Sequence, residues 1–164
     1  MVGTVKALLM KRLLAFAILA AISSVAEARD NRLVRCNISQ ARTDPGGGGP
    51  AFIGDVPRSM TPIDLDAVLW TDTWVLRHVV LEGLFAQRTE TGTLEVTARF
   101  VNCTKSPISI QVRSNFTDGN QIPTEPASMW RTVFISPRAT GVYQERSLAS
   151  DKVANYLLEL RSPN

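Results

Sequence analysis

The sequence offers few residues whose types and spacing could carry out chemistry. His78 is the single histidine, and it lies in the apolar run Arg77–Val80. A histidine in such a run is more often a structural or surface residue than a general base. A nucleophile would also need an activated serine, and the Gly-x-Ser-x-Gly motif is absent. We therefore expect that the protein is not an enzyme.

Three acids in the segment 63–72 are the best candidates for a carboxylate site: Asp64, Asp66 and Asp72. A calcium loop would place acids at alternating positions around a glycine and close with a later glutamate. That glycine is missing here, so solvated charges are the simpler interpretation. A hydrolase with dispersed carboxylates stays open as a third and weakest hypothesis, since two distant acids can converge in a fold.

The two cysteines, Cys36 and Cys103, suit a disulfide better than a metal site. Zinc is not expected, because the chain has one histidine and no Cys-x-x-Cys motif. In an oxidising compartment the pair would close a loop of about 65 residues, and the alternative is two separate thiols. We expect no metal and no cofactor.

Aromatic and arginine side chains are the more suggestive candidates. Trp70 and Trp74 are four residues apart and would share one side of a strand, while Trp130 is the third tryptophan and is grouped with Arg113. Tryptophan and arginine dominate the binding energy of many protein interfaces. We take these four residues as candidate interaction residues, with three core tryptophans of a small domain as the alternative.

The N-terminal segment reads as a cleavable signal peptide covering residues 1–28. A basic start (Met10-Lys11-Arg12) precedes the apolar run Leu13–Val25, and Ala26-Glu27-Ala28 supplies small residues for cleavage between Ala28 and Arg29. The apolar run has 13 residues, against the roughly 20 that a membrane span needs. Translation starts at Met1 or at Met10, and no integral membrane segment is expected after cleavage.

A lipid anchor is not expected either. Arg35 directly precedes Cys36, and the charged stretch 29–32 separates that cysteine from the apolar run. We therefore expect a soluble periplasmic protein.

We do not expect the protein to bind nucleic acid, because most of its net positive charge lies in the signal peptide and is removed with it. The chain carries +3, and the signal holds three cations (Lys6, Lys11, Arg12) and one anion (Glu27), so +3 less +2 leaves about +1.

The remaining chain divides into two parts. Residues 29–62 look loosely organised, and the run Thr43–Pro50 is too rich in glycine to build a packed element. Residues 63–164 are expected to form the folded domain. The matches to the glycosylation pattern at Asn37, Asn102 and Asn115 are expected to be chance matches in a bacterial periplasmic protein.

From Trp74 onward, alternation of apolar and polar residues predicts the fold class. Leu94, Val96, Ala98 and Phe100 alternate with polar residues, which is typical of a strand buried on one face. About six such strands separated by turns predict an antiparallel, immunoglobulin-like β-sandwich. The last run, Val153–Leu160, fits a helix or a strand, and its alternation favours the strand.

The same region resembles the YcfL-type family of small Gram-negative envelope proteins. The matching text comprises Phe85-Ala86-Gln87-Arg88, the turn at Gly92, the strand 94–102, and a later group of short motifs: Ile110-Gln111-Val112-Arg113, Asn115-Phe116, Asp118-Gly119, Trp130 and Ser136-Pro137. The resemblance implies a sandwich-like domain of uncharacterised function. Family members are commonly lipoproteins, whereas this chain lacks the anchoring cysteine and carries an extra glycine-rich segment.

These observations favour a non-catalytic periplasmic accessory or interaction protein that serves cell-envelope assembly and whose partner is another envelope protein. The alternative is a periplasmic protein that binds a small ligand between the sheets or near Trp70 and Trp74.

Overall fold

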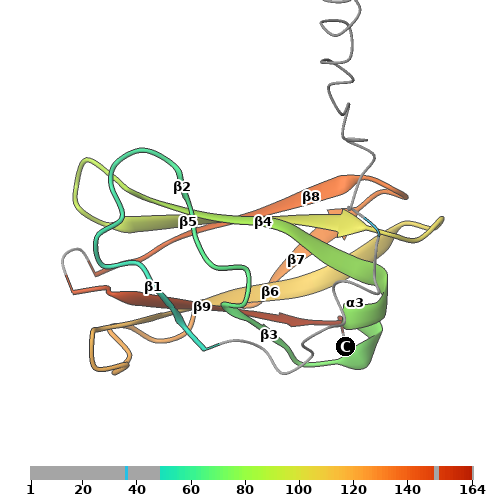
Figure 1. The fold of residues 1–164 in the computed structure, drawn as a ribbon. Helices are drawn as coiled ribbons and strands as arrows, with labels where there is room; N and C mark the ends of the chain where they lie inside the picture. The colour runs from blue at the N-terminus through green and yellow to red at the C-terminus, as the bar shows by residue number, and fades with distance from the viewer. Residues whose placement is uncertain (1–35, 37–48, 150–151, 164) are drawn as a thin grey trace, which may run out of the picture. The chain divides into compact units, whose positions relative to one another are not determined.

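The computed structural model describes Cys36 and residues 49–149 and 152–163 (Figure 1). The expected signal peptide, its cleavage point at Ala28 and Arg29, and most of the glycine-rich run lie outside the described residues. All of the described residues belong to the unit 34–164, and the fold below is theirs. No helix among the described residues combines the length and the apolar composition that crossing a membrane requires.

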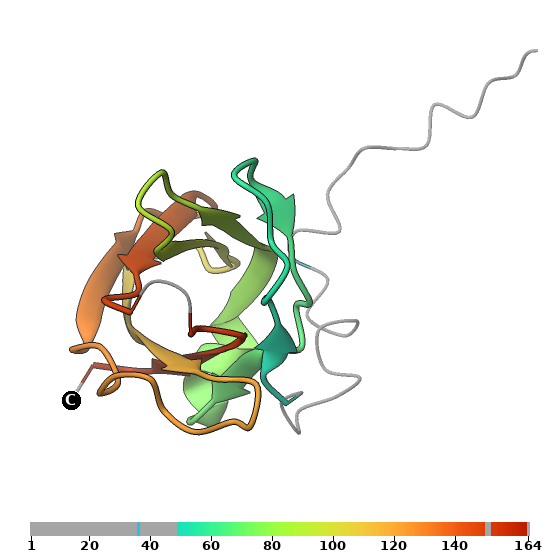
Figure 2. The ribbon, with the colours of Figure 1, turned by 90° about the vertical axis from the view of Figure 1, so that its left-hand side faces the viewer.

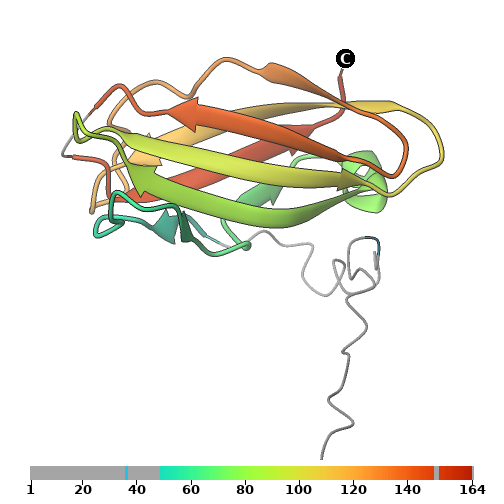
Figure 3. The ribbon, with the colours of Figure 1, turned by 90° about the horizontal axis from the view of Figure 1, so that it is seen from above.

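Two sheets pack face to face, as Figures 1 and 3 show. The five-stranded sheet has the order β1-β9-β6-β7, with β3 pairing parallel to β9; its strands are β1 (Ala51–Phe52), β3 (Val68–Trp70), β6 (Ile108–Thr117), β7 (Arg131–Ile135) and β9 (Asn155–Arg161). The four-stranded sheet has the order β2-β4-β5-β8; its strands are β2 (Thr61–Pro62), β4 (Val79–Arg88), β5 (Leu94–Asn102) and β8 (Thr140–Arg146). The expected β-sandwich is confirmed.

The core lies between the sheets, which Figure 2 shows nearly end-on. The four alternating apolar residues of β5 are all fully buried, as the period of two requires. Residues from both sheets fill the interior, and the largest of the fully buried side chains include Tyr156, Phe100, Phe116, Ile53, Leu84, Leu94, Ile110, Ile135, Leu158 and Leu160.

The last element is a strand, as its alternation predicted. β9 lies inside the five-stranded sheet, between β6 on one side and β1 and β3 on the other. Tyr156, Leu158 and Leu160 all point into the core. A helix over the same residues would leave β6 without a neighbour on that side.

The expected strand that starts at Trp74 instead starts at Val79, after the short helix α3 (Thr73–His78). The carboxylate of Asp72 accepts a hydrogen bond from the backbone N–H of Val75 at 2.8 Å, which caps the first turn of the helix. Val75 is buried and fixes α3 against the core. The strand begins where the β-branched pair Val79 and Val80 begins.

The short strands β1 and β2 lie before residue 63, the expected start of the folded domain. Their backbones pair with β9 and β4, and neither strand has the apolar alternation by which the others could be predicted. A long connection, residues 118–130, separates β6 from its neighbour β7.

The expected disulfide is present. Cys36 and Cys103 are bonded, with their Cα atoms 5.3 Å apart and a sequence separation of 67. Cys103 is buried in the turn between β5 and β6. The bond therefore ties the segment before the glycine-rich run to the sandwich.

Candidate interaction surface

Three of the four predicted interaction residues lie on or beside the outer face of the five-stranded sheet. Arg113 lies on β6, Trp130 directly precedes β7, and Trp74 lies on α3. Trp70 lies on β3 and packs against the core, so it takes the alternative role of a core residue. The expected side-by-side placement of Trp70 and Trp74 fails, because one is in a strand and the other is in a helix.

Trp130 contacts two arginines. The guanidinium carbon of Arg113 lies 4.5 Å from the centroid of the indole ring, and that of Arg161 lies 4.2 Å from it. Both distances are those of cation–π interactions. Arg113 and Arg161 point outward because their neighbours Val112 and Leu160 point into the core.

Glu159 and Gln111 hold these arginines in place. Glu159 lies opposite Arg113 in the β6–β9 register and accepts its hydrogen bond at 2.8 Å, while Gln111 lies opposite Arg161 and accepts from its Nε at 2.8 Å. The second carboxylate oxygen of Glu159 accepts from Asn115 at 2.7 Å. Arg161 was missed from the sequence, because its pairing with Gln111 depends on strand register.

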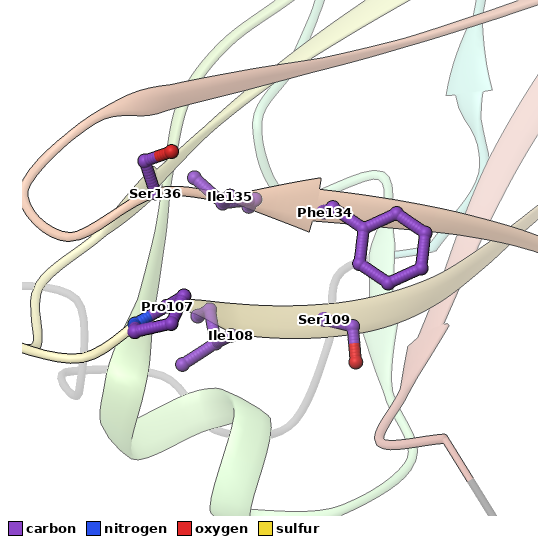
Figure 4. Close-up of a pocket in the computed structure, with 6 residues that line it drawn as sticks. All are labelled: Pro107, Ile108, Ser109, Phe134, Ile135 and Ser136. Carbon is purple, nitrogen blue, oxygen red and sulfur yellow. The ribbon is translucent and has the colours of Figure 1, made fainter.

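A hollow lies beside this cluster, at the start of β6. Its volume is about 260 Å³, and Figure 4 shows the residues that line it: Pro107, Ile108, Ser109, Phe134, Ile135 and Ser136. Phe134 is paired with Ser109 across the strands and has 81% of its surface exposed. The exposure of Phe134 was also missed from the sequence, because strand alternation alone does not say which face is covered.

A second, wider hollow adjoins the first and reaches α3. It has a volume of about 620 Å³ and is lined by Trp74, Ser162 and Pro163 together with Pro107, Ile108 and Ser109, which line the first hollow as well. Trp74 is 42% exposed there. The two hollows therefore form one depression that runs from Phe134 to Trp74.

His78 has a structural place next to this depression. Its ring stacks on Trp74 with centroids 4.6 Å apart, and its Nδ1 lies 2.6 Å from the carbonyl oxygen of Trp74. Both contacts stay within α3. The described residues contain no group of three or more His, Cys, Asp or Glu side chains that could hold a metal ion.

Two of the three candidate acids, Asp64 and Asp72, accept hydrogen bonds from backbone N–H groups. Asp64 accepts a hydrogen bond from the N–H of Asp66 in an exposed turn. Asp72 accepts from the N–H groups of Val75 and Ser162. Burial raises the pKa of the Asp72 carboxyl, but these hydrogen bonds outweigh it, so the pKa lies below its ordinary value.

The outer face of the four-stranded sheet has a different character, because its charges are paired with one another. Arg99 lies 3.1 Å from Glu82, and Arg146 lies 2.7 Å from Glu95. The hydrogen bond from Arg146 is the largest cause that lowers the pKa of the Glu95 carboxyl. This face therefore resembles an ordinary solvated surface.

A buried hydroxyl cluster closes the sandwich between β6, β8 and β9. The Ser114 hydroxyl lies 3.1 Å from that of Tyr143 and 3.0 Å from that of Tyr156, and the Tyr143 hydroxyl donates to Glu145 at 3.3 Å. Burial raises the pKa of both tyrosines, that of Tyr156 well above its ordinary value. These hydroxyls satisfy one another across the two sheets, so their role is structural.

Comparison with known proteins adds two distant structural likenesses. No protein-family model matches the chain, and no curated protein matches it. The crystal structure of Campylobacter jejuni cj0090 has 8% sequence identity and a TM-score of 0.47, covering 59% of this chain and 98% of its own. A DUF1425 family member from Shewanella sp. pv-4 has 14% identity and a TM-score of 0.47, covering 71% of this chain and 98% of its own. Likenesses this weak carry no conclusion about family or function.

Proposed function

We propose that this protein is a non-catalytic accessory protein of the bacterial periplasm, of the YcfL type, that serves envelope assembly by binding another envelope protein. The observation that carries the proposal is the aromatic face. We define it as Trp74, Trp130 and Phe134 together with Arg113 and Arg161, on and beside the outer side of the five-stranded sheet.

The composition of the aromatic face supports protein binding. Exposed aromatic side chains grouped beside arginines are typical of interface centres, where they lose water on binding and supply most of the affinity. Phe134 exposes most of its surface although it lies on a strand with a full core on its other side. The four-stranded sheet carries paired charges instead. The two faces therefore differ in the property that a binding surface needs.

A small-ligand-binding protein is the second candidate. The wide hollow beside Trp74, at about 620 Å³, has the size of a small-molecule site. The space between the sheets is filled by the core cluster, so a ligand would bind at this hollow. Tryptophan fluorescence titrations and native mass spectrometry would detect such a ligand.

Site-specific photo-crosslinking tests the proposal directly. A photoreactive phenylalanine analogue is placed at Phe134 or at Val142, which is 57% exposed on the outer face of the four-stranded sheet. We expect position 134, and not position 142, to give a defined crosslinked protein in cells. The same crosslinks from both positions, or none from position 134, would contradict the proposal.

The periplasmic location is tested separately. Release by osmotic shock, with Arg29 as the first residue of the released chain, is the expected result. A chain that keeps residues 1–28 and stays inside the cell would overturn the location.

A further inference from the structure

We propose that the aromatic face binds an extended acidic peptide segment, with one carboxylate on Arg161 and an apolar side chain in the hollow beside Phe134. This inference rests on the proposed function and names the chemistry of its partner. It follows from the charge balance at Trp130, from the way the arginines are held, and from the spacing of rows along β6.

The positive charges beside Trp130 outnumber the negative charges by one. Two guanidinium groups contact the indole ring, and the carboxylate among their hydrogen-bond partners is that of Glu159. Both oxygens of Glu159 already accept hydrogen bonds, one from Arg113 and one from Asn115. Asp72, near the far end of the depression, is likewise occupied by backbone N–H groups.

Arg161 is the cation that remains available. Its Nε donates to Gln111, whose amide is neutral. Within the part of the chain that the structure describes, its two terminal nitrogens make no hydrogen bond and no ion pair. A guanidinium group in this state offers a planar pair of donors, which matches a carboxylate.

The indole ring and Gln111 also prepare Arg161 for binding. The central carbon of its guanidinium group lies 4.2 Å from the centroid of the indole ring, and its Nε lies 2.8 Å from the amide oxygen of Gln111. A side chain that is already ordered loses little conformational entropy when a partner binds. A carboxylate at Arg161 would therefore gain a charge-assisted hydrogen bond at low ordering cost.

The spacing of the rows suits an extended chain. Outward-facing side chains that are paired across the strands form rows, which follow one another along β6. Phe134 is in the row of Ser109, and Arg161 is in the next row, that of Gln111. The guanidinium group of Arg161 reaches Trp130, near the third row, that of Arg113. Rows on one face of a strand repeat about every 6.6–6.8 Å. An extended peptide repeats its side chains at the same interval, so an acid at one position and an apolar residue two or four positions away reach both sites.

A second copy of this chain is a competing occupant, because Asp64, Leu65 and Asp66 form an exposed acid–leucine–acid turn. Such a contact would join two different surfaces of two copies, and it would continue as an open chain of molecules unless the geometry closes. An external peptide does not carry that consequence. We therefore commit to the external peptide and let the experiment decide against the second copy.

Selection from an unbiased peptide display library, with the purified protein as target, tests the inference. We expect the selected peptides to be enriched in Asp or Glu within four positions of an apolar residue. Synthetic versions should bind at least tenfold more weakly when the acid is replaced by its amide, and similarly more weakly to Arg161→Gln. The matched control Arg99→Gln removes an exposed arginine from the other sheet and should leave the affinity unchanged.

Each other outcome is decisive. Neutral peptides whose binding is lost in Phe134→Ser would overturn the acidic specificity and leave the proposed function standing. Peptides that depend on neither Arg161 nor Phe134, or a selection that yields none, would overturn both. Concentration-dependent self-association that Asp64→Asn and Asp66→Asn abolish would assign the face to a second copy. The acid-to-amide comparison is made on the unaltered protein, so it still decides if Arg161→Gln does not fold.

Discussion

Buried polar side chains hold several connections of this sandwich together, and Asn102 holds the most. It is completely buried at the end of β5. Its amide nitrogen lies 2.8 Å from the carbonyl oxygen of Ser106 and 3.1 Å from those of Ile135 and Ser136, while its amide oxygen accepts from the N–H of Thr104. Although Asn102 matches a glycosylation pattern, its amide is engaged in joining two turns.

Replacing Asn102 with alanine should lower the free energy of unfolding by about 2–3 kcal/mol, because several backbone groups would lose their partner while buried. Urea denaturation followed by circular dichroism measures the change. Asn120→Ala is the control, since Asn120 is exposed in a turn. Equal stability of the two variants would show that solvent reaches the groups around Asn102.

The Glu95–Arg146 pair should make stability depend on pH in a defined direction. Arg146 lowers the pKa of Glu95 below the ordinary value of 4.5, so the pair stabilises the fold above that pH and loses its contribution as the pH falls through the lowered pKa. Arg146 is more than half exposed, so the effect is small. We expect Arg146→Gln to cost about 0.5 kcal/mol at pH 7, with the difference from wild type shrinking below pH 4.5.

Denaturation curves recorded from pH 7 to pH 3 in low salt would measure that difference. High salt should reduce it at neutral pH. A difference that grows as the solution becomes more acidic would contradict the assignment.

At the scale of elements, the turn from β7 to β8 carries the chain from one sheet to the other and depends on close packing. Gly141 in β8 is buried, and a Cβ atom added there would lie 2.7 Å from Cγ1 of Ile135 and 3.0 Å from Cγ1 of Val133. Both neighbours belong to β7. The missing side chain therefore allows the two edge strands to approach.

Gly141→Ala should destabilise the protein by about 1–3 kcal/mol, since both neighbours would have to shift within a packed region. Thermal unfolding would show this as a lower midpoint. Gly119→Ala is a matched control, because nothing lies within 4 Å of the added Cβ and the residue is in an exposed turn. A drop as large for Gly119→Ala would mean that the added methyl acts through the backbone and not through packing.

At the scale of the whole molecule, the Cys36–Cys103 disulfide cross-links the N-terminal segment to the sandwich. The bond stabilises the fold mainly by restricting the unfolded chain, since it keeps two positions that are 67 apart in the sequence joined after unfolding. The sandwich core itself is built from residues after position 50. Reduction should therefore leave the fold intact and less stable.

Reduction should lower the free energy of unfolding by about 4 kcal/mol, the loop-closure entropy for a loop of this length. Guanidinium denaturation of the oxidised protein and of the reduced, alkylated protein measures it. The double variant Cys36→Ser, Cys103→Ser should match the reduced protein and should not respond to dithiothreitol. Unchanged stability on reduction would contradict this account, because the unfolded chain would then gain no more freedom than the folded one.

Local sequence patterns determined most of the strands and the pairing of the cysteines. Alternation with a period of two is a property of neighbouring residues, so the buried faces of β5, β6 and β9 could be predicted. The helix α3 was missed, because its six residues are too few to show a helical period and its stability comes from the Asp72 cap and from the buried Val75. With two cysteines, a single intramolecular pairing was available.

The aromatic face was determined only in part by the sequence. Residue type alone selected Trp130 and Arg113, and also Trp70, which packs against the core. Arg161 and Phe134 needed the tertiary structure, because cross-strand register and the packing of the second sheet decide which side chains meet and which faces stay open. These contacts join residues up to 50 positions apart, as Gln111 and Arg161 are, and no local pattern records such a distance.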